Sequence, residues 1–422
     1  MKNRIALGLT FLILVLAALS CNLPWEQEPT PVGAIETKVS ETPTEKEAET
    51  ETATSTVMIT PSLTPTEEIS VPLPVFPSPV ILEFEMFTPS HGWALTQDND
   101  RLLRTVDGGQ TWLDATPADL HPLPAGLTTL GLQPFFLDES IAWFTPNSVG
   151  SELYHTRDGG VSWTVNAIPF ERARYFFLDA NLGYALVDLG AAAGSHYVAI
   201  YRTADSGATW VEIFTHEPGK SKSLREGGSK GGITFLDVNH GWIGGNIPME
   251  DHFYLYYSSD GGATWAQETD ISLPGLYAGS FLDVRQPFFI NNIVGYLPVR
   301  AMALDSTMHL LVYRSDDSGQ TWAFHNAVQD GRDMDFYSVD GGWIAAGAKL
   351  LQTVDGGANW TPVTGAGIPP GEAILEVDFV DDQHGWVIVT PDESTLIPLK
   401  LYTTTDGGAH WSQVLPLTSR FQ

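Results

Sequence analysis

Cysteine and basic residues are both scarce in this 422-residue chain. Its one cysteine, Cys21, excludes an intramolecular disulfide framework and a cysteine-rich zinc site. Only 21 Lys and Arg face 51 Asp and Glu, which gives a net charge of −30. A nucleic-acid-binding protein needs a basic surface that displaces counterions from phosphate, so nucleic acid is excluded as a partner. Tryptophan, in contrast, is abundant: the chain has 13, and their positions are informative.

An apolar run of 16 residues, 5–20, follows two basic residues near the N-terminus. It is shorter than the ~20 residues that span a bilayer comfortably, and it suits the core of a signal peptide. The run ends in the letters ALSC, which resemble the lipobox of bacterial lipoproteins. The resemblance implies a signal peptide over residues 1–20 and a lipid on Cys21. The rest of the chain would then be exported and anchored to the bacterial cell membrane. An ordinary signal peptide or an uncleaved anchor is the alternative.

Residues 21–80 have a different composition. Residues 22–80 contain 10 Glu, 11 Thr and 10 Pro, with few large apolar side chains before residue 71. Such a segment cannot bury enough apolar surface to offset the entropy lost on ordering. We therefore predict a disordered tether over residues 21–80 that holds a domain away from the membrane.

One octet occurs seven times in residues 81–422. Residues 105–112, TVDGGQTW, fit the pattern Ser/Thr-x-Asp-x-Gly-x-Thr-Trp, here called the Asp octet. Ser162, Asn359 and His410 replace the threonine in three copies. The aspartates are Asp107, Asp158, Asp205, Asp260, Asp317, Asp355 and Asp406, and the closing tryptophans are Trp112, Trp163, Trp210, Trp265, Trp322, Trp360 and Trp411.

A second motif precedes each octet and reads Phe-x-polar-x-x-x-Gly-Trp/Tyr, as in residues 235–242. It is here called the Gly-Trp motif. Together the two motifs contain 12 of the 13 tryptophans. A repeat of about 49 residues that is rich in aromatic residues and glycine turns predicts four strands per repeat. The sequence thus predicts an all-β, seven-bladed β-propeller of antiparallel blades over residues 81–422.

The Asp octet resembles the Asp-box, or bacterial neuraminidase repeat. This repeat occurs in sialidases, xyloglucan-degrading hydrolases, sortilin-type receptors and photosystem II stability/assembly factors. Pairing with the Gly-Trp motif is most like the last family, which implies a non-enzymatic propeller that binds a protein. That family presents an arginine-rich surface, whereas residues 81–422 here have a net charge of −24. We interpret the seven aspartates as turn formers and their tryptophans as packing between blades.

Both motifs fall in the turns at one end of each blade and have constant length, whereas the connections at the other end vary. Variable loops on a rigid frame are the usual place for binding. The innermost strand precedes each Gly-Trp motif, so residues one and three positions before its Phe should line the central channel. Three neighbouring blades place acidic residues there: Glu83, Glu85, Asp333, Asp335, Glu376 and Asp378.

These six carboxylates are a candidate cation site or a pocket for a basic ligand, and a hydrated channel mouth is the simpler alternative. Blade 3 has Arg174 in the same phase, with Arg172 nearby. Histidines show no metal-ligand spacing, so no metal or cofactor is expected apart from a cation that the acidic mouth would allow. A second candidate is the basic loop 216–232, either a docking loop for an acidic partner or a solvated segment, with Lys220, Lys222, Arg225 and Lys230.

The expected partner is an envelope or extracellular protein. Glycan binding is an alternative, for which Tyr277 is a candidate, and glycoside hydrolysis is another. A sialidase-like enzyme is disfavoured because the Arg-Ile-Pro segment that opens those sequences is absent. The xyloglucan enzymes use two propellers, and this chain has repeats for one. The sequence does not indicate how the last blade joins the first. Residues 75–80 either add an outer strand or do not.

Overall fold

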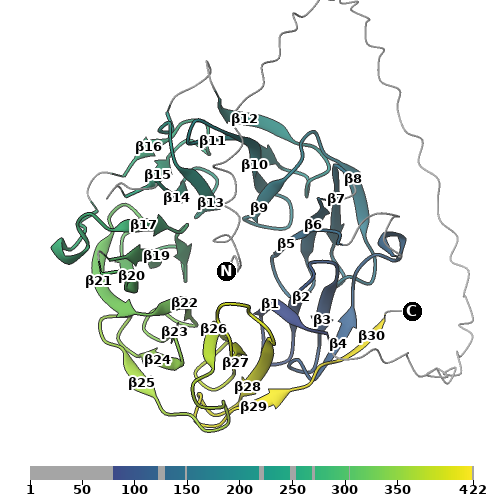
Figure 1. Cartoon of the computed structure of the whole chain (residues 1–422). Helices are drawn as coiled ribbons and strands as arrows, with labels where there is room; N and C mark the ends of the chain where they lie inside the picture. Colours follow the sequence, from purple (N-terminus) through teal and green to yellow (C-terminus); the bar gives the residue numbers. More distant parts are fainter. Residues whose placement is uncertain are drawn as a thin grey trace, which may run out of the picture. The chain divides into compact units, whose positions relative to one another are not determined.

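The computed structural model describes residues 79–121, 129–147, 150–217, 223–247, 253–268, 271–303 and 305–420. Seven β-sheets follow one another along these residues and surround a common centre (Figure 1). Two short 3-10 helices, η2 (Ala118–Leu120) and η3 (Gly275–Tyr277), are the helices of the described part. The predicted seven-bladed propeller is confirmed. The predicted signal peptide, Cys21 and nearly all of the tether lie outside the described residues.

From the centre outward, blades 1 to 3 contain β1 (Ile81–Met86), β2 (Gly92–Thr96), β3 (Leu102–Thr105) and β4 (Thr111–Asp114); β5 (Leu132–Phe136), β6 (Ala142–Pro146), β7 (Glu152–Thr156) and β8 (Thr164–Ala167); and β9 (Ala173–Phe177), β10 (Gly183–Ala192), β11 (Ser195–Thr203) and β12 (Val211–His216). Blade 4 contains β13 (Ser229–Phe235), β14 (Gly241–Asn246), β15 (Leu255–Ser258) and β16 (Ala266–Gln267).

Blade 5 has a divided inner strand, β17 (Phe281–Val284) and β18 (Phe288–Phe289), followed by β19 (Gly295–Met302), β20 (Met308–Ser315) and β21 (Ala323–Gln329). The last two blades contain β22 (Gly331–Phe336), β23 (Gly342–Ala346), β24 (Lys349–Thr353) and β25 (Thr361–Val363), and β26 (Ala373–Phe379), β27 (Gly385–Thr390), β28 (Lys400–Thr404) and β29 (Ser412–Val414).

The ring closes through the C-terminal strand β30 (Leu417–Arg420). This strand pairs in parallel with β4, with Leu417 opposite Thr111 and Arg420 opposite Asp114 (Figure 1). A propeller has no covalent seam between its last and first blades, so a strand shared across that seam restrains them. The outer edge of blade 1 is therefore occupied by the C-terminus. Residues 79–80 form no strand, and residues 75–78 lie outside the described residues.

Each Asp octet forms the turn between the third and fourth strands of its blade. In blade 3, Asp205 Oδ1 accepts the backbone N–H of Thr209 at 2.8 Å, and Oδ2 accepts the Thr209 hydroxyl at 2.6 Å. The hydroxyl of Thr203 accepts the N–H of Gly207, whose φ of 87° suits glycine. These bonds, first that from the Thr209 hydroxyl, hold the pKa of Asp205 below its usual value.

The relaxed threonine slot follows from the same geometry. Ser162, Asn359 and His410 each donate a side-chain hydrogen bond to the second carboxylate oxygen of their aspartate, at 2.6, 2.7 and 2.7 Å. The position requires a short side chain or ring with a donor, and threonine is one of several solutions.

The aromatic residue that ends each Gly-Trp motif is fully buried in all seven blades. In four blades it stacks closely on the motif phenylalanine of the next blade: Trp143 on Phe177 at 3.7 Å, Tyr184 on Phe235 at 3.6 Å, Tyr296 on Phe336 at 3.7 Å and Trp343 on Phe379 at 4.1 Å. The octet tryptophan contacts the same phenylalanine edge-on, as Trp210 does Phe177. Each such phenylalanine is thus packed between an aromatic side chain of the preceding blade and one of its own.

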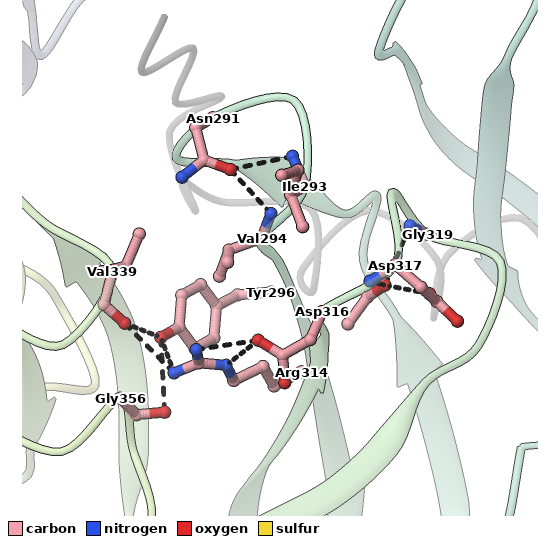
Figure 2. A network of polar contacts seen from close by, with 11 residues as sticks. Asn291, Ile293, Val294, Tyr296, Arg314, Asp316, Asp317, Gly319, Val339 and Gly356 are labelled. Atoms are coloured by element: carbon pink, nitrogen blue, oxygen red, sulfur yellow. Dashed lines mark hydrogen bonds and ion pairs between the residues drawn. The ribbon is translucent and has the colours of Figure 1, made fainter.

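In five blades the polar end of this aromatic residue also donates a hydrogen bond to the next blade. Trp143 Nε1 donates to the carbonyl oxygen of Ser206, and Trp386 Nε1 to that of Gly108, both at 2.9 Å. Figure 2 shows the tyrosine version between blades 5 and 6. The Tyr296 hydroxyl donates to the carbonyl oxygen of Val339 at 2.9 Å, and Arg314 Nη1 donates to the same oxygen at 3.1 Å. The tryptophan excess therefore belongs to the core between blades.

Replacing Asp205 by alanine should lower the free energy of unfolding by about 1–3 kcal/mol, because the Thr209 N–H and the Thr203 and Thr209 hydroxyls lose their acceptor. Urea denaturation measures this change. The matched control is Glu171→Ala at an exposed position of the same blade, which should leave stability unchanged. Equal stability of both variants would contradict the structural role of the Asp octet.

Candidate functional site at the channel mouth

The innermost strands surround the channel as the sequence predicts. Figure 1 shows β1, β5, β9, β13, β17, β22 and β26 nearest the centre. Each inner strand ends at its Gly-Trp turn, so its first residues lie at the opposite end of the channel, beside the variable loops. This end is here called the channel mouth.

The six acidic residues lie on the inner strands of blades 6, 7 and 1, and four of them accept hydrogen bonds from the next blade. Asp335 Oδ2 accepts the backbone N–H of Phe379 at 2.6 Å, and Asp378 Oδ2 accepts that of Met86 at 2.7 Å. Both aspartates are 1% exposed. An inner strand has a free edge with unpaired N–H groups, and burying them without a partner is costly. The carboxylates satisfy these donors.

The residues two positions earlier repeat this arrangement. Asp333 Oδ2 accepts the N–H of Val377 at 2.9 Å, and Glu376 Oε1 accepts that of Phe84 at 3.4 Å. Four of the six carboxylates therefore link consecutive blades. Glu85 is 5% exposed. No three His, Cys, Asp or Glu side chains in the described residues are arranged to hold a metal ion. Binding of a cation or a basic ligand by the six residues stays a prediction.

Glu83 is the exception in this series. It occupies in blade 1 the position of Asp333 and Glu376, and its expected donor would be the N–H of residue 134. That residue is Pro134, which has no N–H. Glu83 accordingly forms no hydrogen bond among the described residues, and burial raises its pKa to about 7. Burial also raises the pKa of Glu376, and the negative charges of Asp333 and Glu83 add to this effect.

Positive charge gathers on the other side of the channel mouth, on blades 3 and 5. Burial lowers the pKa of Arg174 on β9, and the positive charge of Arg285 adds to this effect. Burial lowers the pKa of Arg300 on β19 to about 10, again helped by Arg285. Asp283 pairs with Arg285, with its Oδ2 3.0 Å from Nε. Asp283 thus acts on all three arginines, while Asp188 also acts on Arg174 and Asp333 on Arg300.

Glycines in blade 4 allow these arginines to approach one another. A Cβ atom on Gly232 would lie 1.9 Å from Gln286 Oε1, and one on Gly244 would lie 2.5 Å from the carbonyl oxygen of Val284. The segment from Val284 to Gln286 therefore packs directly on the backbone of blade 4. The approach needs glycine at position 244, where the neighbour is backbone, whereas the flexible Gln286 side chain faces Gly232.

A cavity of about 210 Å³ lies beside Arg174, and blades 2, 3 and 4 line it. Its charged side chains are Arg172, Arg174, Asp188 and Lys230. Lys230 is 2% exposed, donates to the carbonyl oxygen of Gly227 at 3.2 Å and lies over the Tyr254 ring. Burial lowers the pKa of Lys230 to about 8. We refer to this cavity as the basic pocket.

His196 and Asp188 complete the basic pocket. His196 Nδ1 accepts the backbone N–H of Lys230 at 3.2 Å, so Nε2 carries the proton and donates to Asp188 Oδ1 at 3.1 Å. Burial lowers the pKa of His196, which keeps the ring neutral at pH 7. Asp188 also accepts the N–H of Gly190 and lies 3.7 Å from Arg172 Nη1. The pocket therefore holds three cations against one carboxylate.

The predicted basic loop has a different structure from the one expected. Lys230 lies in strand β13 and is buried, so it does not belong to an exposed flexible loop. Arg225 lies before this strand, and its backbone N–H donates to the Tyr256 hydroxyl at 3.2 Å. Lys220 and Lys222 lie outside the described residues. The role of His196 and Asp188 was not foreseen, because β10 and β11 bring them together across a long hairpin.

Two further features concern glycans and membranes. Tyr277, the candidate for stacking on a sugar, is 3% exposed and packs against His309, so that hypothesis is wrong for this residue. The sequence alone does not indicate whether a single tyrosine in a loop, such as Tyr277, is buried or exposed. None of the helices in the described residues has the length and apolarity to cross a membrane.

Solved structures similar to this chain are β-propeller proteins. A structure of YCF48 bound to D1 peptide is 18% identical, with a TM-score of 0.47, and the match covers 80% of this chain and 95% of YCF48. YCF48 from Cyanidioschyzon merolae is 17% identical, with a TM-score of 0.46 and coverage of 79% and 97%. A GH74 xyloglucanase from Xanthomonas campestris is 13% identical, with a TM-score of 0.53, over 83% of this chain and 55% of the enzyme.

At these identities the likeness concerns the fold alone. The predicted β-propeller fold is confirmed at that level, and the resemblance to Asp-box proteins stays a prediction. The sequence matches no protein-family model, and the comparison with curated proteins gives no match either.

Replacing Asp378 by alanine should destabilise the protein by about 1–3 kcal/mol, because the buried N–H of Met86 would lose its acceptor. Asp378→Asn keeps one acceptor oxygen and should cost less. Urea denaturation of both variants gives the comparison. If alanine and asparagine were equally tolerated, the carboxylates would not be what links the blades.

Glu83 should make stability depend on pH. Its pKa is raised on folding from 4.5 to about 7, so the folded state binds more protons than the unfolded state between these values. Stability should therefore fall as the pH rises from about 4.5 to 7. Melting temperatures at pH 5 and pH 8 measure this fall, which Glu83→Gln should reduce.

Pro134→Ala provides an independent check of the same interaction. It restores an N–H opposite Glu83, which should lower the pKa of Glu83 and also flatten the pH dependence. Glu171→Gln is the control, because its side chain is exposed. An unchanged slope in both Glu83→Gln and Pro134→Ala would show that Glu83 is not the titrating group.

Proposed function

We propose that this protein is a binding propeller without catalytic activity, which engages an envelope or extracellular protein through the channel mouth and its variable loops. In this proposal Cys21 carries a lipid, residues 21–80 act as a tether, and the propeller lies outside the cytoplasm. The observation that carries the proposal is the unequal use of charge at the mouth. Four carboxylates accept N–H groups between blades, whereas Arg174, Arg300 and Lys230 have no direct carboxylate partner among the described residues.

The carboxylates that accept backbone N–H groups favour binding over catalysis. A glycosidase needs two carboxyl groups that face the substrate, one protonated and one ionised. Asp335 and Asp378 are buried, and their oxygens face the adjacent inner strand. Arg174, Arg300 and Lys230 have no carboxylate partner among the described residues, and such cations bind anionic groups more readily than they transfer protons.

A glycoside hydrolase is the second candidate function, and Glu83 is the observation that favours it. A carboxylic acid with a pKa of about 7 is suited to act as a general acid. Its neighbour Glu376 has a raised pKa too, but that side chain accepts the N–H of Phe84. Among the described carboxylates of the channel mouth, Glu83 combines a raised pKa with the absence of such a hydrogen bond, and one carboxyl group does not make a catalytic pair.

The two functions differ in a direct assay on the full-length protein. We expect no turnover of a fluorogenic sialoside and glucan panel, and capture of one envelope protein from membrane extracts. Capture should be reduced by Arg172→Glu at the mouth and retained by Gln110→Glu in an exposed octet turn at the other face. Turnover that disappears in Glu83→Gln would overturn the proposal, as would capture that both variants reduce equally.

A further inference from the structure

We propose that the basic pocket binds a carboxylate of an acidic peptide segment. This inference rests on the proposed function, because it names the chemistry that the channel mouth would recognise in a protein partner. It concerns the cavity between Arg172, Arg174 and Lys230, away from the acidic residues of blades 6, 7 and 1.

Two cations of the basic pocket, Arg174 and Lys230, form no ion pair with a carboxylate among the described residues. Arg174 forms no hydrogen bond or ion pair among the described residues, although Asp188 and Asp283 act on it from a distance. Lys230 donates to one carbonyl oxygen and faces an aromatic ring, and Glu226 is the carboxylate that acts on it electrostatically. Burying a cation without a partner is costly, and an anionic ligand would remove that cost.

The single carboxylate of the pocket cannot serve this purpose. Asp188 Oδ1 already accepts the N–H of Gly190 at 2.7 Å and the proton of His196 Nε2 at 3.1 Å. Its other oxygen lies 3.7 Å from Arg172, whose side chain is 60% exposed. Asp188 therefore orients the histidine and offsets one positive charge at most. An excess of positive charge remains in a propeller whose total charge is strongly negative.

The lining of the pocket favours a peptide carboxylate over a sugar. Polar groups from three blades converge on the cavity, including the amides of Gln133 and Asn147. No Trp, Tyr or Phe lines it, so it lacks the flat aromatic surface that usually supports a sugar ring. Its volume of about 210 Å³ is below the range typical of cavities for larger ligands, and it suits a carboxylate with a short aliphatic stem.

Neighbouring arginines indicate a ligand with more than one carboxylate. Arg285 and Arg300 lie next to this side of the mouth, and Arg300 Nε has no hydrogen-bond partner in the described residues. Positive charge therefore continues from the pocket on blade 3 to blade 5. An acidic segment would place one carboxylate in the pocket and a second one near Arg300, and the carboxylates of blades 6, 7 and 1 would repel it from the opposite side.

Fluorescence anisotropy with a labelled hexaglutamate peptide and the full-length protein tests this inference. Hexaglutamate should bind, and hexalysine and hexaglutamine should not. Arg174→Gln and Lys230→Met should each weaken binding by about 10-fold or more, since each removes a charge-assisted contact. Arg174→Lys, which keeps the charge, should restore part of the affinity. The control is Lys349→Met, an exposed lysine at the variable-loop end of blade 6, which should change binding by less than about 2-fold.

Several outcomes would overturn the inference. Equal weakening by Lys349→Met would mean non-specific attraction, and binding of oligogalacturonate in place of hexaglutamate would mean an acidic glycan. Melting temperatures identify variants that do not fold, and Arg174→Lys then provides the decisive comparison. If hexaglutamate does not bind while partner capture persists and is insensitive to Arg174→Gln, this inference fails and the proposed function stands. Glycoside turnover would contradict the proposed function instead.

Discussion

One aromatic side chain from each blade crosses to the next, and the propeller depends on this contact. The aromatic residue at the end of the Gly-Trp motif is buried in every blade, and in several blades it stacks on the next phenylalanine at about van der Waals distance. In five of the seven blades its N–H or O–H also donates to a carbonyl oxygen of the next blade, as Tyr296 does to Val339. Such a residue combines a large apolar surface with one directed hydrogen bond, which fixes both the spacing and the rotation of neighbouring blades. The accepting carbonyl oxygen lies in an Asp octet for Trp143 and Trp386, and in the Gly-Trp turn of the next blade for Tyr296.

The inner strands create a second constraint, which explains the charges of the channel mouth. Each inner strand has a free edge whose N–H groups need acceptors, and blades 6 and 7 supply aspartate and glutamate oxygens for the blade that follows. Pro134 removes one of these donors and leaves Glu83 without a bond. Acidic residues in this region are therefore largely part of the scaffold. Arg174, Arg300 and Lys230 on blades 3 to 5 have no carboxylate partner among the described residues, and in our proposal they are the groups available to a ligand.

The fold could be predicted from the sequence because each repeat carries the same two motifs at constant internal spacing. The stacking of Trp143 on Phe177 recurs between other pairs of blades, and the residues that make it therefore recur as a motif in the sequence. Counting back from the phenylalanine of each Gly-Trp motif is sufficient to place Glu376, Asp378 and their neighbours at the channel mouth. Their hydrogen bonds to the adjacent blade could not be predicted, since they depend on the offset between two strands. Ring closure by β30 depends on a contact that occurs once and so has no repeat signal.

The basic pocket was missed for a similar reason. Arg172 and Arg174 are close in sequence, but His196 and Lys230 reach them only through the pairing of β10 with β11 and the approach of β13. Lys230 was grouped with the lysines of a loop, although it is a buried strand residue. Strand β13 contains two adjacent glycines, so its alternation of polar and apolar side chains does not show which residues point inward.

The central claim is that the carboxylates of the channel mouth hold blades together whereas the cations of blades 3 to 5 bind the ligand. Hydrogen–deuterium exchange of the full-length protein with and without hexaglutamate tests it most directly. The account predicts added protection at residues 172–198 and 227–232, and no change in β22, β26 and β1. Added protection in β22, β26 and β1 on addition of hexalysine, with none in blade 3 on addition of hexaglutamate, would contradict it.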